Sequence, residues 1–180
     1  PSVGSESSAD IRVVRSHGTQ SIVQAKNLEF LLDHVWDKGD SQETMYTTGV
    51  RERVSWVLEG FNTTVLCYGQ TGSGKTHTMF GPDEVLDPNT FIHSDRALHG
   101  IMPRACAQLF ESMAHADAEI TYVVHVSYVE CYNGMLRDLL ATTKRDSVVL
   151  REAKSGLLME GLSHTLVSSP ARLEPSRHTR

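Results

Sequence analysis

The chain has 180 residues, 39% of them hydrophobic, and a formal net charge of −5 at pH 7. A chain of this length forms one ordinary domain and can bury about 70% of its unfolded surface. The acidic balance argues against nucleic acid as the main partner, and the sequence shows no signal peptide or membrane span. Three widely spaced cysteines fit reduced thiols in a cytoplasmic protein better than disulfides or a zinc site.

The amino-terminal part of the sequence predicts a tail, a small sheet and a helix. Residues 1–10 are small and polar, so we expect a disordered tail. Three short apolar runs within residues 11–32 are separated by polar turns, which predicts an antiparallel meander. Asp40 and Glu43 resemble a capping box at a helix start, and apolar residues at helical spacing then continue to a stop at Gly60.

The strongest chemical signal is an uninterrupted match to the phosphate-binding pattern G-x-x-x-x-G-K-[ST]. Such a loop needs a strand before it and a helix after it, because it turns sharply and directs backbone N–H groups at an anion. Residues 63–68 are β-branched and apolar, which favours a buried parallel strand, and residues 76–80 can start a helix. The candidate nucleotide-binding residues of the loop are Gly69, Gln70, Thr71, Gly72, Ser73, Gly74, Lys75 and Thr76.

The residue types of this loop point to polyphosphate. The glycines at 69, 72 and 74 let the backbone approach phosphate oxygens, and the helix that follows adds unpaired N–H donors and its positive dipole end. Lys75 is expected on the β- and γ-phosphates. Thr76 is expected to place its hydroxyl on Mg²⁺, which binds sparsely to protein and mostly to phosphate and water.

The segment after the loop is less regular. Residues 81–99 show no clear period and form either a functional loop or a partly mobile insertion. A helix is expected to resume near Ile101, with Pro103 early in it, where the missing N–H costs nothing. Residues 120–129 are apolar on both alternate faces, which predicts a central strand covered on two sides.

The carboxyl-terminal part predicts a further helix and a hairpin. Within the strand just described, His125 and Ser127 are the polar exceptions, and we expect both to be hydrogen-bonded core residues. Asn133 is expected to cap a helix whose leucines pack inward. Residues 147–159 predict a hairpin, and residues 170–180 form a polar tail. Alternating strands and helices around a phosphate loop predict a three-layer α/β architecture.

Several blocks of the sequence, in order and in register, resemble the amino-terminal part of a kinesin motor domain. Position 134 departs from the family pattern, because it holds glycine where the family has glutamate. The blocks that carry the resemblance are residues 30–36 (FLLDHVW), 57–64 (VLEGFNTT), 68–79 (YGQTGSGKTHTM), 100–104 (GIMPR), 126–140 (VSYVECYNGMLRDLL) and, more weakly, 149–161.

The resemblance implies a P-loop NTPase three-layer sandwich of the kinesin-motor type, incomplete and spanning residues 11–169. It implies Mg·ATP as ligand, with His77 in the adenine pocket. It also implies a parent protein that is a cytoplasmic, cytoskeleton-associated, microtubule-dependent motor. A second tubulin contact of the family falls in the hairpin block, where Arg151 and Lys154 are the basic groups.

The sequence departs from the family in the parts that hydrolyse ATP. The adenine-gripping Arg-x-Arg-Pro has no counterpart, and the switch I serine-rich motif and the switch II motif Asp-x-x-Gly-x-Glu are absent from the 180 residues. No catalytic residue is therefore identified, and uncovered apolar faces are expected. Two alternatives to a partial motor stay open here: a non-motile nucleotide- or tubulin-binding module, and an unrelated P-loop NTPase or small-molecule kinase.

Overall fold

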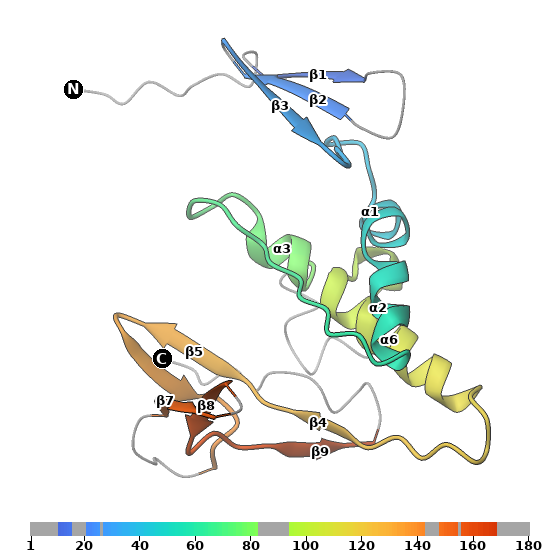
Figure 1. Ribbon diagram of the computed structural model, residues 1–180. Coiled ribbons are helices and arrows are strands. Elements are labelled where there is room, and N and C mark those ends of the chain that lie inside the picture. The colour runs from blue at the N-terminus through green and yellow to red at the C-terminus, as the bar shows by residue number, and fades with distance from the viewer. Residues whose placement is uncertain are drawn as a thin grey trace.

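A computed structural model describes residues 11–15, 21–25, 27–82, 94–142, 148–154 and 156–168. Its elements follow the chain in three groups: a meander of strands, a set of helices and a set of antiparallel strand pairs (Figure 1). The predicted tails at 1–10 and 170–180 lie outside the described residues, as does most of the segment 81–99. No helix in the described part is both long enough and apolar enough to cross a membrane.

The predicted amino-terminal meander is confirmed. It consists of β1 (Ile11–Arg15), β2 (Ser21–Ala25) and β3 (Leu28–Leu32), which pair antiparallel in the order β1-β2-β3. In this register Val23 of β2 lies opposite Phe30 of β3. An antiparallel sheet of this kind can leave one face exposed, and every residue of β3 is exposed.

The helices form the middle group and hold the main apolar cluster. They are α1 (Gln42–Gly49), α2 (Arg51–Leu58), α3 (Lys75–Met79), the 3₁₀-helix η2 (Arg96–Leu98) and α6 (Ile101–Ala114). The predicted helices after the phosphate loop and near Ile101 are thus confirmed. The cluster consists of four buried side chains from α1, α2, the residue between them, and α6: Tyr46, Val50, Val54 and Ile101.

The predicted helix start at Asp40 is wrong by one residue. Ser41 is the N-cap of α1, and its hydroxyl oxygen accepts a hydrogen bond from the Thr44 amide at 3.0 Å. The carboxylate of Asp40 is used elsewhere, because it accepts a hydrogen bond from the Asp37 amide at 2.7 Å. Serine and aspartate are both favoured caps, so residue type does not distinguish Asp40 from Ser41, and the backbone geometry at Ser41 decides.

The predicted single helix is divided at Val50, whose φ of −125° leaves the helical range. The indole of Trp36 causes close packing at this point, since a Cβ on Gly49 would lie 2.6 Å from two of its ring carbons. The indole N–H also donates to the Thr48 hydroxyl at 3.0 Å. The chain entering α1 from β3 therefore packs against the last turn of α1.

The carboxyl-terminal group consists of three antiparallel strand pairs. They are β4 (Val124–Val126) with β9 (Thr165–Val167), β5 (Val129–Tyr132) with β6 (Met135–Asp138), and β7 (Val149–Ala153) with β8 (Gly156–Glu160). The β7–β8 pair confirms the predicted hairpin at 147–159.

The predicted central strand at 120–129 is wrong. Only three of its residues form β4, which has β9 as its single neighbour among the described strands, and Val123 is 65% exposed. His125 is exposed, so its prediction as a core residue is also wrong. Ser127 does make the expected hydrogen bonds, donating to the Ser163 carbonyl at 2.7 Å.

The predicted helix after Asn133 is wrong, because Asn133 and Gly134 form the turn of the β5–β6 hairpin. Their φ angles are +50° and +75°. Positive φ at both central residues defines the tight turn that matches the twist of two antiparallel strands, and Asn-Gly is the dipeptide that adopts it most readily. The glycine that departs from the family pattern thus supports this turn.

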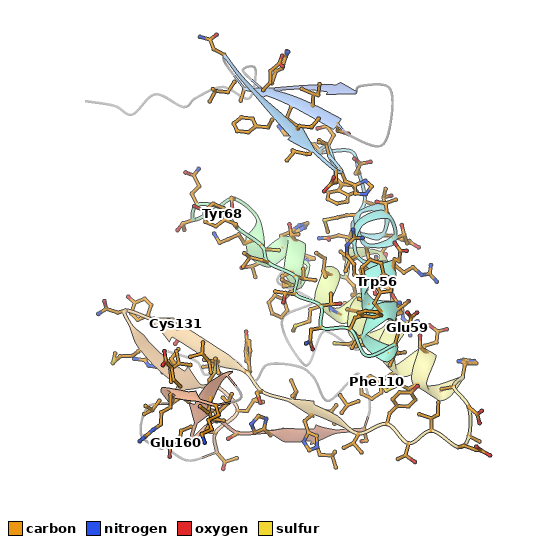
Figure 2. The ribbon with its side chains drawn as sticks, viewed as in Figure 1. Trp56, Glu59, Tyr68, Phe110, Cys131 and Glu160 are labelled. Atoms are coloured by element: carbon orange, nitrogen blue, oxygen red, sulfur yellow. The ribbon has the colours of Figure 1, made fainter. Side chains whose placement is uncertain are left out.

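The predicted strand at 63–68 is also wrong, since these residues form no strand in the structure. Leu66 is 83% exposed and Tyr68 is 96% exposed, and Figure 2 shows Tyr68 on the segment before α3. A parallel strand depends on hydrogen bonds to neighbouring strands and on cover over both faces. Among the described residues all strand pairs are antiparallel, and none includes this segment. The expectation of uncovered apolar side chains is confirmed here.

Close backbone packing at Gly100 generates a first prediction. Its amide donates to the Phe80 carbonyl at 2.9 Å, and a Cβ would lie 2.6 to 2.7 Å from backbone atoms of residues 79–81. Backbone cannot move aside as a flexible side chain can, so Gly100→Ala should destabilise the fold by about 1–3 kcal/mol and lower Tm in thermal unfolding. Gly39→Ala is the control, because a Cβ there meets nothing within 4 Å. Equal Tm values for the two variants would contradict this packing.

Candidate functional site

The phosphate-loop residues form a tight turn that leads directly into α3. Gly72 and Gly74 have φ of +81° and +88°, and Gly74 is the N-cap of α3 in the left-handed conformation. The Ser73 amide donates to the Gln70 carbonyl at 3.2 Å, which closes the turn. Glycine at these two positions is required by the backbone itself, because other residues adopt such angles only with strain.

Lys75 is held across its own loop. Its ammonium donates to the Gly69 carbonyl at 2.9 Å and to the Gln70 carbonyl at 2.7 Å. Both acceptors are neutral, so they orient the ammonium without neutralising its charge. Anionic oxygens would bind the same group more strongly, because the ammonium would then face an opposite charge in place of a neutral carbonyl dipole. The arrangement therefore offers a positive charge to an anion that enters the loop.

Thr76 and His77 follow Lys75 in the first turn of α3, and both are exposed. His77 contacts α1, where the side-chain amide of Gln42 lies 2.7 Å from the His77 carbonyl oxygen and 3.1 Å from Nδ1. The structure thus brings together all of the predicted loop residues and His77. It adds Gln42, which the sequence analysis did not assign to the site.

Arg104 stabilises the segment from η2 to the start of α6, and the sequence analysis did not assign this residue to the site. Its guanidinium donates to the carbonyls of Arg96 at 2.8 Å, Ala97 at 3.1 Å and His99 at 2.8 Å. These bonds tie η2 to the start of α6. Burial, together with the charge of Arg104, lowers the pKa of His99 and favours its neutral form. The sequence signal of Arg104 was its place at the end of the block 100–104 (GIMPR), directly after Pro103, but that block assigned no role to it.

The predicted basic residues of the hairpin lie away from the loop. Arg151 is on β7 and forms an ion pair with Glu160 of β8, while Lys154 is exposed at the turn between the strands. Figure 1 shows β7 and β8 in the carboxyl-terminal group and α3 in the helical group. The structure does not join these residues and the loop into one site.

A second cluster resembles a catalytic triad in composition but not in geometry. Ser127 lies 2.9 Å from His164 Nδ1, and Asp138 accepts a hydrogen bond from the Ser163 amide at 2.7 Å. Because the Ser127 hydroxyl donates its proton to the Ser163 carbonyl, it is not aligned for transfer to the imidazole. Burial alone would raise the pKa of Asp138, but its hydrogen bonds outweigh burial and lower the pKa. The cluster fastens the turn before β9.

An apolar groove of about 360 Å³ lies between α2, α6 and the segment that enters β4, with Phe110 of α6 on its wall (Figure 2). None of the phosphate-loop residues lines it. The groove contains the thiol of Cys106, and burial raises the pKa of this thiol to about 11. Since thiolate is the reactive form, Cys106 is inert near neutral pH.

A family profile described as Kinesin motor domain matches residues 4–175 of the chain. Kinesin-related protein 3 of Dictyostelium discoideum is 36% identical over 141 residues, which cover 78% of this chain and 11% of that protein. Kinesin heavy chain of Gibberella moniliformis is 39% identical over 140 residues, which cover 78% of this chain and 14% of that protein.

A solved structure described as that of a fast kinesin is similar in three dimensions. The TM-score is 0.76 at 32% identity, and the match covers 92% of this chain and 46% of that chain. The match confirms the predicted fold class, a P-loop α/β fold of the kinesin-motor type that is represented in part. The chain spans less than half of that solved structure.

The left-handed glycine before α3 generates a second prediction. Gly74→Ala should cost about 1–2 kcal/mol because an alanine Cβ is strained at positive φ, and it should weaken binding of inorganic triphosphate about tenfold by reshaping the loop. Gly60→Ala is the matched control, since Gly60 has a φ of +93° outside the loop. We expect similar losses in Tm but a calorimetric loss of affinity for Gly74→Ala alone. Equal triphosphate affinities would contradict a role for this backbone in anion binding.

Proposed function

The chain belongs to the kinesin motor domain family, and we propose that it is the ATP-binding part of a microtubule-dependent motor. One observation carries the proposal: an intact phosphate loop turns through two left-handed glycines into α3 and holds the Lys75 ammonium against neutral carbonyls. Binding of a nucleoside triphosphate requires a loop of this kind, with a positive charge available for the phosphates.

The residues present fit Mg·ATP. The loop N–H groups and Lys75 would hold the β- and γ-phosphates, and Lys75 would exchange two neutral acceptors for charged ones. The hydroxyl of Thr76 would contribute to the Mg²⁺ shell. When bound, Mg²⁺ supplies neutralisation of the phosphate charge. His77 follows at the next position and is assigned to the adenine side of the site.

Hydrolysis is not assigned to any residue of this chain. The 180 residues contain no Asp-x-x-Gly-x-Glu motif, and in P-loop motors the switch loops orient the attacking water and complete the metal shell. We therefore assign nucleotide binding to the segment 11–169 and coupled ATP turnover to the complete motor.

The microtubule is the proposed partner of that motor. The proposed location of the motor is the cytoplasm, in association with the cytoskeleton. Within this chain the proposed tubulin contact is the β7–β8 hairpin. Lys154 and Arg151 are exposed there, and Arg151 retains 65% side-chain exposure although it pairs with Glu160. An exposed ion pair contributes little to stability, so Arg151 can exchange its partner for an acidic surface at small cost.

A third prediction tests the loop directly. Lys75→Ala should abolish measurable Mg·ATP binding in isothermal titration calorimetry, because Lys75 places a charge at the phosphates that neutral loop groups cannot replace. Lys38→Ala removes an exposed lysine from the turn before α1 and should bind as the wild type does. Circular dichroism on each variant establishes that both are folded. Undiminished binding by Lys75→Ala would refute the proposed site.

A fourth prediction concerns turnover. The chain should show negligible phosphate release from ATP, and taxol-stabilised microtubules should not stimulate it, because the switch motifs are absent. The assay is phosphate release with and without microtubules, with a complete kinesin motor domain as the positive control. Robust stimulation would show that residues of this chain perform the catalytic work of the switches.

A further inference from the structure

Gln42 links the start of α1 to the helix that carries the phosphate loop. It is the first residue of α1 and lies 35 positions before His77 in the chain. Its amide nitrogen Nε2 lies 2.7 Å from the backbone carbonyl oxygen of His77 and 3.1 Å from the ring nitrogen Nδ1. One side chain therefore contacts both the backbone and the imidazole of a residue next to the loop.

The carbonyl contact decides which way the amide of Gln42 faces. A carbonyl oxygen only accepts hydrogen bonds, so the group 2.7 Å away must be the NH₂ and not the oxygen. A flipped amide would place two oxygens at that distance, where their lone pairs repel. The Oε1 atom consequently points away from His77, into a position where it is buried and makes no hydrogen bond with any residue that the structure describes. Leaving a buried acceptor without a hydrogen bond costs free energy, so the hydrogen bonds of Nε2 to His77 must offset the cost of the unpaired Oε1.

The orientation of the amide in turn decides the protonation of the ring. An NH₂ group has only donors to offer, and Nδ1 can receive one of them only if it carries no proton itself. A neutral imidazole with a bare Nδ1 has its proton on Nε2. The hydrogen-bond network thus selects one tautomer of His77.

We propose that Gln42 is a positioning residue that holds His77 in its Nε2–H tautomer and fixes the orientation of the ring beside the phosphate loop. This presents an N–H donor for acceptor atoms of a nucleobase, such as the ring nitrogens of a purine. The assignment of a base to His77 rests on the proposed function, whereas the tautomer rests on the contacts alone. A purely structural role for Gln42, fastening α1 to the backbone of α3, requires no particular tautomer.

The tautomer is measured by long-range ¹H–¹⁵N correlation of the imidazole rings in the ¹⁵N-labelled chain, with His77→Asn to assign the signals. In the wild type we expect the unprotonated shift at Nδ1 and the protonated shift at Nε2. Gln42→Met keeps the length of the side chain but removes the donor, so both shifts should move toward the average of two tautomers. Gln42→Glu replaces the donor by an acceptor. The His77 carbonyl oxygen repels this acceptor, while Nδ1 can pair with it only as an N–H donor, so the variant should favour the Nδ1–H tautomer.

The matched control is Gln24→Met, which alters a glutamine of β2 whose amide contacts Glu29. It should leave the His77 signals unchanged. A wild-type ring with its proton on Nδ1, or His77 shifts that ignore both Gln42 substitutions, would overturn the proposal. If Gln42→Met does not fold, Gln42→Glu carries the test, because it changes one atom of the amide and keeps the volume.

Calorimetry separates this inference from the proposed function. Gln42→Met should weaken Mg·ATP about fivefold, the worth of one neutral hydrogen bond, and leave inorganic triphosphate unaffected. Equal weakening of both ligands would overturn the base-side role, since Gln42 would then act through the loop. If the His77 tautomer responds as expected but neither protein binds Mg·ATP, the nucleotide proposal fails while the tautomer assignment stands.

Discussion

The contact of Ile101 with Tyr46, Val50 and Val54 is the constraint on which the rest of the described chain depends. It packs α6 against α1 and α2, and Met79 at the end of α3 packs on the same cluster. Helix α3 has only five residues, too few to be stable alone, so the phosphate loop is held by this packing and by the Gly100–Phe80 backbone contact. The binding loop is thus positioned by tertiary contacts more than by its own helix.

Polar groups at this cluster are satisfied within the helices. The Tyr46 hydroxyl donates to Gln108, whose amide in turn donates to the Arg51 carbonyl and the Ser55 hydroxyl. Burial raises the pKa of Tyr46 to about 12, which keeps the hydroxyl protonated as a donor. The loop differs, because the acceptors of the Lys75 ammonium within the described part of the chain are the neutral carbonyls of Gly69 and Gln70. The loop leaves a positive charge for a ligand, whereas the polar groups around Tyr46 and Gln108 hydrogen-bond to one another.

Structure that depends on neighbouring residues could be predicted from the sequence, whereas the pairing of strands far apart in the chain could not. The loop, the helix after it, the meander and the hairpin at 147–159 depend on residue type and short spacing, and all four form as expected. The segment 63–68 has the composition of a buried strand but no neighbouring strand among the described residues. The leucines near Asn133 have helical spacing, yet Asn-Gly at 133–134 adopts positive φ and turns the chain into a hairpin. Turn chemistry outweighed periodicity at that position.

The sequence by itself determined the loop, since glycines at 72 and 74 and the lysine at 75 are needed at those positions by backbone geometry and charge. It also determined the family, because six blocks keep their order and spacing. Only the tertiary structure decided where the Lys75 ammonium rests, that Arg104 fastens η2, and that Gln42 reaches His77. Those contacts join residues 5 to 35 positions apart through side-chain orientations that packing sets, and no local pattern encodes such orientations.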